Sequence, residues 1–264
     1  MPPAPSHHDA HALRPIDAVV GMILVAAAAL AAWLVTGGGG SSGPPASSTP
    51  PAAISAGAPI VSAPPPAQQV IDLRRFQQRR PLHVPARWVA GFYPLYGVAA
   101  RTFGVNWLLL ASIHDQETSF STDRTTYAGL NFAHCCGGSM QFNVINKPVS
   151  TWSRVADSFR YGSRPPSYPH ATIQHPSIYD DFDAMMAAAR LLAADGARQG
   201  LDARAWSAAY DYYGHDATGI TYADQVVARA ISWSQRGLCV NCPLDERIVA
   251  AVHAAYAPAV LGRR

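Results

Sequence analysis

Apolar residues after position 100 recur at intervals of three or four, the spacing that lines them up along one face of an α-helix. Val105, Leu109 and Ile113 follow this spacing and predict a helix over 105–117. Further runs of the same kind predict helices over 182–195, 203–213, 222–235 and 245–256. No run shows the two-residue alternation of several strands, so the predicted fold class is mainly α.

The stretch 180–196 indicates how one of these helices begins and ends. Asp180 and Asp181 precede the run FDAMMAAARLLAAD, and their carboxylates suit the capping position and the positive end of the helix dipole. Gly196 follows the run, where a glycine commonly ends a helix. We therefore expect the two aspartates to cap the helix and not to bind a metal. The Pro-, Tyr- and His-rich stretch 160–178 predicts an ordered loop.

The longest apolar run lies near the N-terminus. As a helix, residues 16–35 would span about 30 Å, the thickness of a bilayer core. Arg14 precedes the run and no charge follows it until Asp72, which predicts that residues 1–15 form a short cytoplasmic tail. The prediction is a single transmembrane anchor with the rest of the chain outside the cytoplasm. The alternative is a cleaved signal peptide, in which case the protein is secreted.

A linker is predicted after this run. Residues 36–67 contain eight Pro, six Gly, six Ser and seven Ala, with no charged or aromatic residue. Such a composition buries too little apolar surface to offset the entropy of ordering, so we expect a disordered linker. The predicted organisation is thus one folded domain, residues 68–264, behind a membrane anchor and a spacer.

The charge of the folded part is modest. Only Asp9, Arg14 and Asp17 fall in the first 67 residues, which leaves 19 Lys and Arg against 15 Asp and Glu in the rest. A nucleic-acid-binding protein would show a dense basic stripe, so no nucleic-acid partner is expected. With 49 % hydrophobic residues the chain can build a core, which excludes a fully disordered protein.

All four cysteines lie in the predicted folded domain. They are Cys135, Cys136, Cys239 and Cys242, and outside the cytoplasm such thiols oxidise. A bridge between adjacent cysteines strains the peptide that joins them, so we expect two cross-links between the 135–136 pair and the 239–242 pair. A zinc site of four thiolates is the alternative, although adjacent cysteines fit the usual ligand spacing poorly.

Two features of this domain suggest chemistry. Glu117 continues the apolar row of the predicted helix 105–117, where partial desolvation favours the protonated form that a general acid requires. The run Gly138–Phe142 contains a glycine that permits close approach of the backbone to a ligand, and Ser139 and Gln141 supply donors and acceptors for sugar groups. Glu117 alone would more simply be a buried carboxylate paired with an arginine or a backbone amide.

Together with other motifs, these features resemble the lytic murein transglycosylases, which have a lysozyme-like fold. The motifs are Gly104-Val105-Asn106-Trp107, Glu117-Thr118-Ser119-Phe120, Gly138-Ser139-Met140-Gln141-Phe142 and Ala209-Tyr210-Asp211-Tyr212-Tyr213-Gly214. The resemblance covers roughly residues 82–236. The last motif departs from the family's Ala-Tyr-Asn, so Tyr210 or Tyr213 can stand for its tyrosine. We favour Tyr213, because Gly214 then ends the helix and the chain leads on to Tyr222.

The resemblance implies cleavage of the β-1,4 bond between N-acetylmuramic acid and N-acetylglucosamine in peptidoglycan. It makes Glu117 the catalytic acid and then the base that closes a 1,6-anhydro ring, with no cofactor and no obligatory second carboxylate. The implied substrate-binding residues are Phe120 as a cleft wall, Ser139, Met140, Gln141, Tyr213 and Tyr210. The implied partners are glycan strands, the membrane and proteins of a cell-wall or secretion complex. The expected location is the bacterial cell membrane.

Three other functions remain open at this point. A hydrolytic muramidase needs a second carboxylate, for which Asp123 and Asp115 are candidates, although Asp123 suits a turn cap and Asp115 a solvated charge. A non-catalytic glycan-binding scaffold would keep the fold without turnover. A metalloenzyme built on His114, Asp115, His134 and the cysteines lacks regular ligand spacing.

Overall fold

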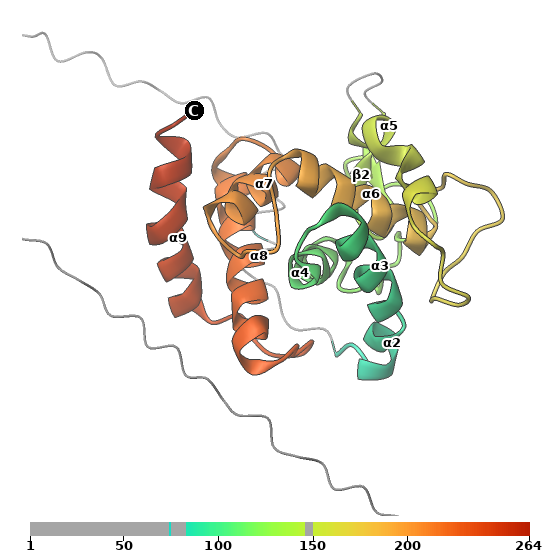
Figure 1. Cartoon of the computed structure of the whole chain (residues 1–264), viewed down its shortest axis with the longest axis horizontal. Helices are drawn as coiled ribbons and strands as arrows, with labels where there is room; N and C mark the ends of the chain where they lie inside the picture. The colour runs from blue at the N-terminus through green and yellow to red at the C-terminus, as the bar shows by residue number, and fades with distance from the viewer. Residues whose placement is uncertain (1–73, 75–82, 146–149) are drawn as a thin grey trace, which may run out of the picture. The chain divides into compact units, whose positions relative to one another are not determined.

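The computed structural model describes residue 74 and residues 83–145 and 150–264 (Figure 1). The described residues all belong to one unit of the chain, residues 61–264. They are mainly helical, as predicted. The predicted membrane span and linker lie outside the described residues. Among the residues that are described, no helix combines the length and the apolar character needed to cross a membrane.

Two helices that pack against each other, α4 (Trp107–Thr118) and α8 (Ala217–Arg236), form the centre of the fold (Figure 1). Helix α4 starts where the Asn106 side chain accepts a hydrogen bond from the backbone amide of Leu108 at 2.9 Å. Arg229 of α8 then ties the two helices together, because its guanidinium pairs with Asp115 at 3.0 Å. This pair is almost fully buried, so the contact fixes the register of α4 on α8.

Helices α3 (Tyr93–Phe103) and α6 (Asp181–Ala194) pack together beside α4. Gly104 ends α3 in a left-handed conformation with φ 71°, which a glycine adopts without strain. Asp180 caps α6, accepting hydrogen bonds from the backbone amides of Phe182 and Asp183. The prediction that Asp180 and Asp181 cap this helix is confirmed for Asp180, whereas the Asp181 carboxylate accepts hydrogen bonds from the Tyr127 phenol and the His170 amide.

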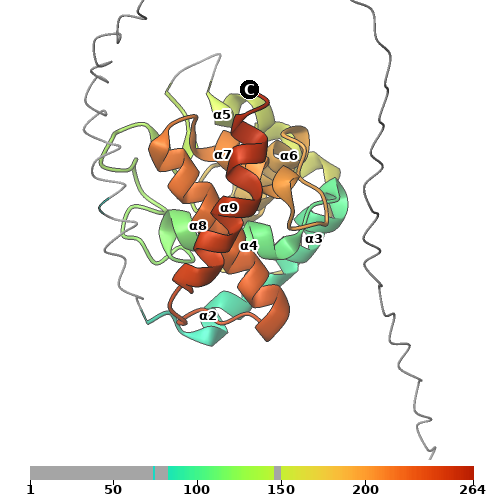
Figure 2. The ribbon, with the colours of Figure 1, turned by 90° about the vertical axis from the view of Figure 1, so that its left-hand side faces the viewer.

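Helices α7 (Ala203–Tyr213) and α9 (Glu246–Leu261) complete the packing around α8 (Figure 2). Asp224 of α8 joins all three helices, because it accepts hydrogen bonds from the indole of Trp206 on α7 at 2.7 Å and contacts the His253 imidazole of α9 at 2.8 Å. Burial raises the pKa of the Asp224 carboxyl.

The predicted helices are confirmed, with changes at their ends. Helix α8 starts before residue 222, because the Asp216 side chain caps it through the amide of Gly219. Helix α9 continues beyond residue 256 and includes Pro258. Four short or interrupted elements were not predicted: α2 (Ala86–Ala90), α3, α5 (Thr151–Val155) and a 3-10 helix, η1 (Ala156–Tyr161). Their apolar runs are too short or too broken by glycine and proline to show a clear period.

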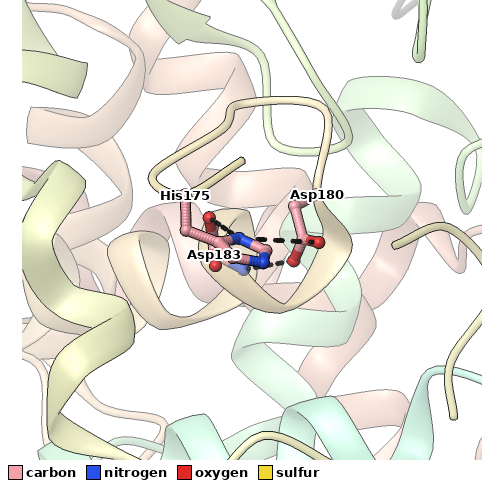
Figure 3. Close-up of side chains that lie close together, drawn as sticks. All are labelled: His175, Asp180 and Asp183. Atoms are coloured by element: carbon pink, nitrogen blue, oxygen red, sulfur yellow. Dashed lines mark hydrogen bonds and ion pairs between the residues drawn. The ribbon is translucent and has the colours of Figure 1, made fainter. Parts of the chain in front are cut away.

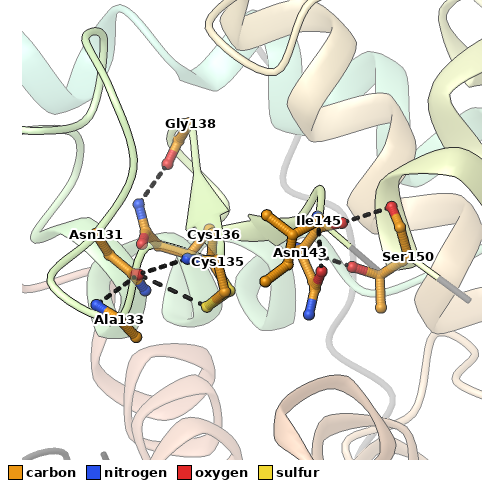
Figure 4. Close-up of a disulfide and its surroundings, with 10 residues drawn as sticks. Asn131, Ala133, Cys135, Cys136, Gly138, Asn143, Ile145 and Ser150 are labelled. Atoms are coloured by element: carbon orange, nitrogen blue, oxygen red, sulfur yellow. Dashed lines mark hydrogen bonds between the residues drawn. A yellow bond between two sulfur atoms is a disulfide. The ribbon is translucent and has the colours of Figure 1, made fainter. Parts of the chain in front are cut away.

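A small hairpin follows the loop after α4 (Figure 4). Its strands are β1 (Cys136–Gly137) and β2 (Phe142–Asn143), which pair antiparallel with Cys136 opposite Asn143. The strands are too short to show alternation in the sequence. Asn131 and Ser150 anchor the two sides of the hairpin, through hydrogen bonds to Cys136 O at 2.7 Å and to Asn143 O at 2.7 Å.

The expected pairing of the cysteines is wrong. One disulfide joins Cys135 to Cys136 (Figure 4) and the other joins Cys239 to Cys242. The two pairs are therefore not cross-linked. Different parts of the fold hold the two pairs: Thr118 of α4 and Tyr212 of α7 bind the hairpin that contains the first pair, whereas the Trp233 indole of α8 donates to Cys239 O at 3.0 Å. Each cysteine therefore lies within bonding distance of its neighbour in its own pair.

We expect peptide mapping without reduction to find each disulfide within a single tryptic peptide. Cleavage after Arg124 and Arg154 releases Cys135 and Cys136 together, and cleavage after Arg236 and Arg247 releases the other pair. Each peptide should be two hydrogens lighter than its reduced form. A peptide that joins the two segments would contradict this pairing.

Candidate active site around Glu117

Glu117 lies one residue before the end of α4, with its side chain half-buried. The phenol of Tyr222 on α8 donates a hydrogen bond to Glu117 Oε1 at 2.6 Å. Tyr222 is fully buried, and this burial, together with the charge of Glu117, raises the pKa of the phenol well above its usual value. The phenol therefore remains a hydrogen-bond donor at every physiological pH, and it fixes the position of one carboxyl oxygen.

The backbone turns sharply after Glu117. Ser119, Phe120 and Ser121 all have positive φ, at 50°, 57° and 62°. Three such residues in succession, none of them glycine, cost about 1–3 kcal/mol each and persist only where the surroundings hold them. Two hydrogen bonds do so: the Trp88 indole donates to Phe120 O at 2.7 Å, and the Ser121 amide donates to Thr118 Oγ1 at 3.0 Å.

A buried histidine, His114, also holds this turn through a side-chain hydrogen bond. His114 has no exposed surface, and its ring nitrogens bond the Tyr96 phenol and the Ser121 hydroxyl, both at 2.7 Å. Burial lowers the pKa of His114 to about 3, so the imidazole is neutral at ordinary pH. His114 is thus a structural link between α3, α4 and the turn, and not a metal ligand or a general base.

The hairpin turn lies against the end of α4. Thr118 Oγ1 donates to Ser139 O at 2.9 Å, and the Tyr212 phenol of α7 donates to Met140 O at 2.7 Å. Gln141 has a positive φ of 48°, and its amide donates to Gly138 O at 3.0 Å. The hairpin backbone is therefore attached both to the residue after Glu117 and to α7.

Gly138 cannot be replaced without moving the backbone. Its φ is 77°, and a Cβ atom at this position would lie 2.0 Å from the carbonyl oxygen of Ile178. The hairpin turn thus presses directly against the segment before α6. The close approach that this glycine permits is to the protein's own backbone.

The structure brings together Glu117 and the predicted run from Ser139 to Gln141, but it places some side chains differently from the prediction. Phe120 has no exposed surface and packs between His114 and Trp233, so the expectation that it walls a cleft is wrong. The Met140 side chain is also fully buried, and Ser139 is 1 % exposed. Gln141 is half-buried and is the member of this run that solvent reaches.

The two candidate tyrosines occupy different places. The ring of Tyr213 lies 5.0 Å from that of Tyr222, which itself binds Glu117. Tyr210 instead stacks on Trp206 at 5.3 Å and lies under the guanidinium of Arg264. The geometry therefore places Tyr213 near Glu117 and Tyr210 in the packing between α7 and the C-terminus.

Two residues of the site were missed as site residues. Tyr212 holds the hairpin through Met140 O, and Tyr222 holds the Glu117 carboxyl. Burial and the charge of Glu117 together raise the pKa of both phenols. The sequence contained a signal for Tyr222, because this residue places a phenol hydroxyl on the apolar face of the predicted helix 222–235. Tyr212 gave none, since its neighbours Tyr210 and Tyr213 are also aromatic.

The candidates for a second carboxylate have other partners. Asp115 pairs with Arg229 and its side chain is 13 % exposed, so the expectation of a solvated charge is wrong. Asp123 accepts hydrogen bonds from the backbone amide and the hydroxyl of Thr125, at 2.9 and 2.8 Å, as expected of a turn-capping residue.

A second cluster of polar residues lies at the start of α6 (Figure 3). His175, Asp180 and Asp183 place ligand-type atoms within 4.8 Å of one another. Arg164 donates to both carboxylates, at 2.9 and 2.8 Å, and occupies the position that a cation would take. Because the backbone amides of Thr172 and Ser177 also donate to these aspartates, we assign the cluster to fastening the loop before α6.

Comparison of the chain with models of protein families, with curated proteins and with solved structures gives no match.

The neutral His114 generates a pH prediction. The pKa of His114 in the folded protein lies below the value of about 6.5 in the unfolded chain. The free energy of unfolding therefore decreases as pH falls from 6.5 towards 3, by about 4 kcal/mol at pH 3. We expect His114→Gln to be less stable than the natural protein at pH 7 and to lose that disadvantage in acid. Chemical denaturation of both proteins across this range measures the difference. A difference that does not change with pH would contradict the assignment.

Proposed function

We propose that this protein is a lytic murein transglycosylase with a lysozyme-like fold. The observation that carries the proposal is the Glu117 carboxyl, which is half-buried, bound at one oxygen by Tyr222 and adjacent to the Ser139–Gln141 run. These are the residue types that the resemblance requires, and the fold brings them together from α4, the hairpin and α8. The substrate is the glycan strand of peptidoglycan.

The proposed reaction uses one carboxyl group twice. Protonated Glu117 donates its proton to the glycosidic oxygen as the bond from that oxygen to the muramyl anomeric carbon breaks, which leaves an oxocarbenium-like centre. The ionised carboxylate then takes the proton of the muramyl 6-hydroxyl, whose oxygen bonds to the anomeric carbon. Glu117 ends protonated, the glycan ends in a 1,6-anhydro ring, and no water is consumed.

The surroundings of Glu117 support a reaction with a single carboxylate. Asp115 is held in an ion pair with Arg229, and Asp123 is held by Thr125 in an exposed turn. Neither carboxylate is free to activate a water molecule. This arrangement favours the transglycosylase over the hydrolytic muramidase.

Tyr222 acts in this proposal as a positioning residue for the acid. Its hydrogen bond to Glu117 Oε1 fixes the orientation of the carboxyl group that carries the transferable proton. Gln141 and Tyr213 are the half-buried groups that would contact the sugar, since Ser139 and Met140 contribute mainly backbone. We further propose that residues 16–35 anchor the domain to a bacterial membrane, so that residues 36–67 let it reach the wall.

Replacing Glu117 by Gln should abolish cleavage and leave the fold intact. The amide keeps the shape and can still accept the Tyr222 hydrogen bond, but it has no proton to transfer, so the loss lies in kcat and not in affinity. The measurement is release of soluble fragments from purified peptidoglycan. Asp123→Asn is the matched control and should retain activity. If the Glu117 variant kept a tenth of the natural activity, Glu117 would not be the acid.

Replacing Tyr222 by Phe should lower kcat roughly tenfold to a hundredfold, the value of one hydrogen bond to a charged group. Tyr256→Phe is the matched control, because it also removes a phenol that donates to a partner, here Leu201 O at 3.2 Å. Equal activities of these two variants would show that Tyr222 does not position Glu117.

A further inference from the structure

The second disulfide, between Cys239 and Cys242, closes a short loop that follows α8 and that we call the disulfide loop, residues 239–242. The loop turns on itself, because the Cys242 amide donates a hydrogen bond to Cys239 O at 3.4 Å. It presents Asn241 at the protein surface. The proposed reaction gives this loop no role, yet its hydrogen bonds extend to the turn after Glu117 along two routes.

The first route begins at the Asn241 side chain. Its carboxamide oxygen accepts a hydrogen bond from the Val84 amide at 2.8 Å, and its nitrogen donates to Val84 O at 3.0 Å. Val84 is 2 % exposed, so both polar groups of its backbone need partners other than bulk water. A carboxamide offers an acceptor and a donor side by side, so one side chain satisfies both groups. Asn241 therefore holds the chain immediately before α2.

Helix α2 extends this attachment to the turn after Glu117. Pro85 follows Val84 and caps the helix, and its carbonyl accepts a hydrogen bond from the Trp88 amide at 2.9 Å. The Trp88 indole then donates to Phe120 O at 2.7 Å. Phe120 is the middle one of the three successive residues with positive φ. The position of its carbonyl thus depends on α2, which in turn is held through Val84.

The second route reaches Phe120 through α8. The Trp233 indole donates to Cys239 O at 3.0 Å, so the disulfide loop also holds this side chain. The Trp233 ring is 5 % exposed and packs against the Phe120 ring, with centroids 6.2 Å apart. The loop is therefore connected to the carbonyl of Phe120 through Trp88 and to its ring through Trp233.

We propose that the disulfide loop holds the turn after Glu117 in place, with Asn241 as a positioning residue. An exposed side chain on an open loop loses conformational entropy when it binds, and the disulfide reduces this cost because it restricts the loop beforehand. Successive left-handed residues persist only where their surroundings hold them, so loss of these contacts should loosen the turn. For turnover this role rests on the proposed function, but the turn itself can be measured without substrate.

Hydrogen exchange of the full chain, followed by mass spectrometry, tests the proposal. All the backbone amides over 119–123 are hydrogen-bonded, so their protection reports on the turn. In Asn241→Asp the carboxylate can still accept from the Val84 amide but has no donor for Val84 O. Protection over 119–123 should fall about tenfold, the effect of losing one hydrogen bond. Protection over 185–192 in α6 should not change, because the loosening is local.

Asn106→Asp is the matched control for this variant. It also removes an amide donor, here the one to Gln199 O at 2.7 Å, but at the start of α4 and away from the turn. Protection over 119–123 should therefore stay at its natural value in Asn106→Asp.

Opening the disulfide gives a second test that keeps the Asn241 side chain. In the double variant Cys239→Ser, Cys242→Ser the loop is no longer closed, so protection over 119–123 should again fall. The proposal is overturned if either Asn241→Asp or the double variant keeps natural protection over 119–123, or if Asn106→Asp lowers it equally.

Kinetics separate this proposal from the function on which turnover depends. In Asn241→Asp, kcat for soluble glycan fragments should fall several-fold with KM unchanged, because the turn follows Glu117 whereas Gln141 and Tyr213 belong to the hairpin and α7. If the natural protein releases no fragments but exchange follows the expected pattern, the proposed function fails and the role of the disulfide loop in the turn stands. If the natural protein cleaves glycan and Asn241→Asp does so with equal kcat, the function stands and Asn241 is not a positioning residue.

Discussion

The fold depends on one constraint at the end of α4, where the chain must reverse through three successive left-handed residues immediately after Glu117. Such a turn survives only if its polar groups are satisfied from outside, and α2, α3 and α4 each contribute to this. The Trp88 indole binds the Phe120 carbonyl, and Tyr96 orients His114, whose other nitrogen binds the Ser121 hydroxyl. The core around the turn thus fixes the direction in which Glu117 points.

The same turn connects Glu117 to the hairpin. Thr118 bonds both the turn, through the Ser121 amide, and the hairpin, through Ser139 O. The hairpin is therefore placed relative to the carboxyl by a residue adjacent to it, and Tyr212 ties the hairpin to α7.

Periodicity in the sequence was sufficient for the long helices, although α4 and α6 are buried on nearly all sides. It also pointed to Glu117 and the run Ser139–Gln141, since a carboxylate in an apolar row and a glycine-rich turn are local features. The pairing of the cysteines, the burial of Phe120 and the partner of Asp115 were not predictable, because each is decided by residues distant in sequence. The left-handed turn has no glycine to indicate it.

The central claim is that Glu117 breaks the glycosidic bond without activating water. The most direct test is digestion of purified peptidoglycan in water enriched with heavy oxygen, followed by mass spectrometry of the released fragments. The account predicts muramyl ends that carry the 1,6-anhydro ring and contain no heavy oxygen. Reducing ends that each contain one heavy oxygen atom would contradict it and would show a hydrolytic muramidase.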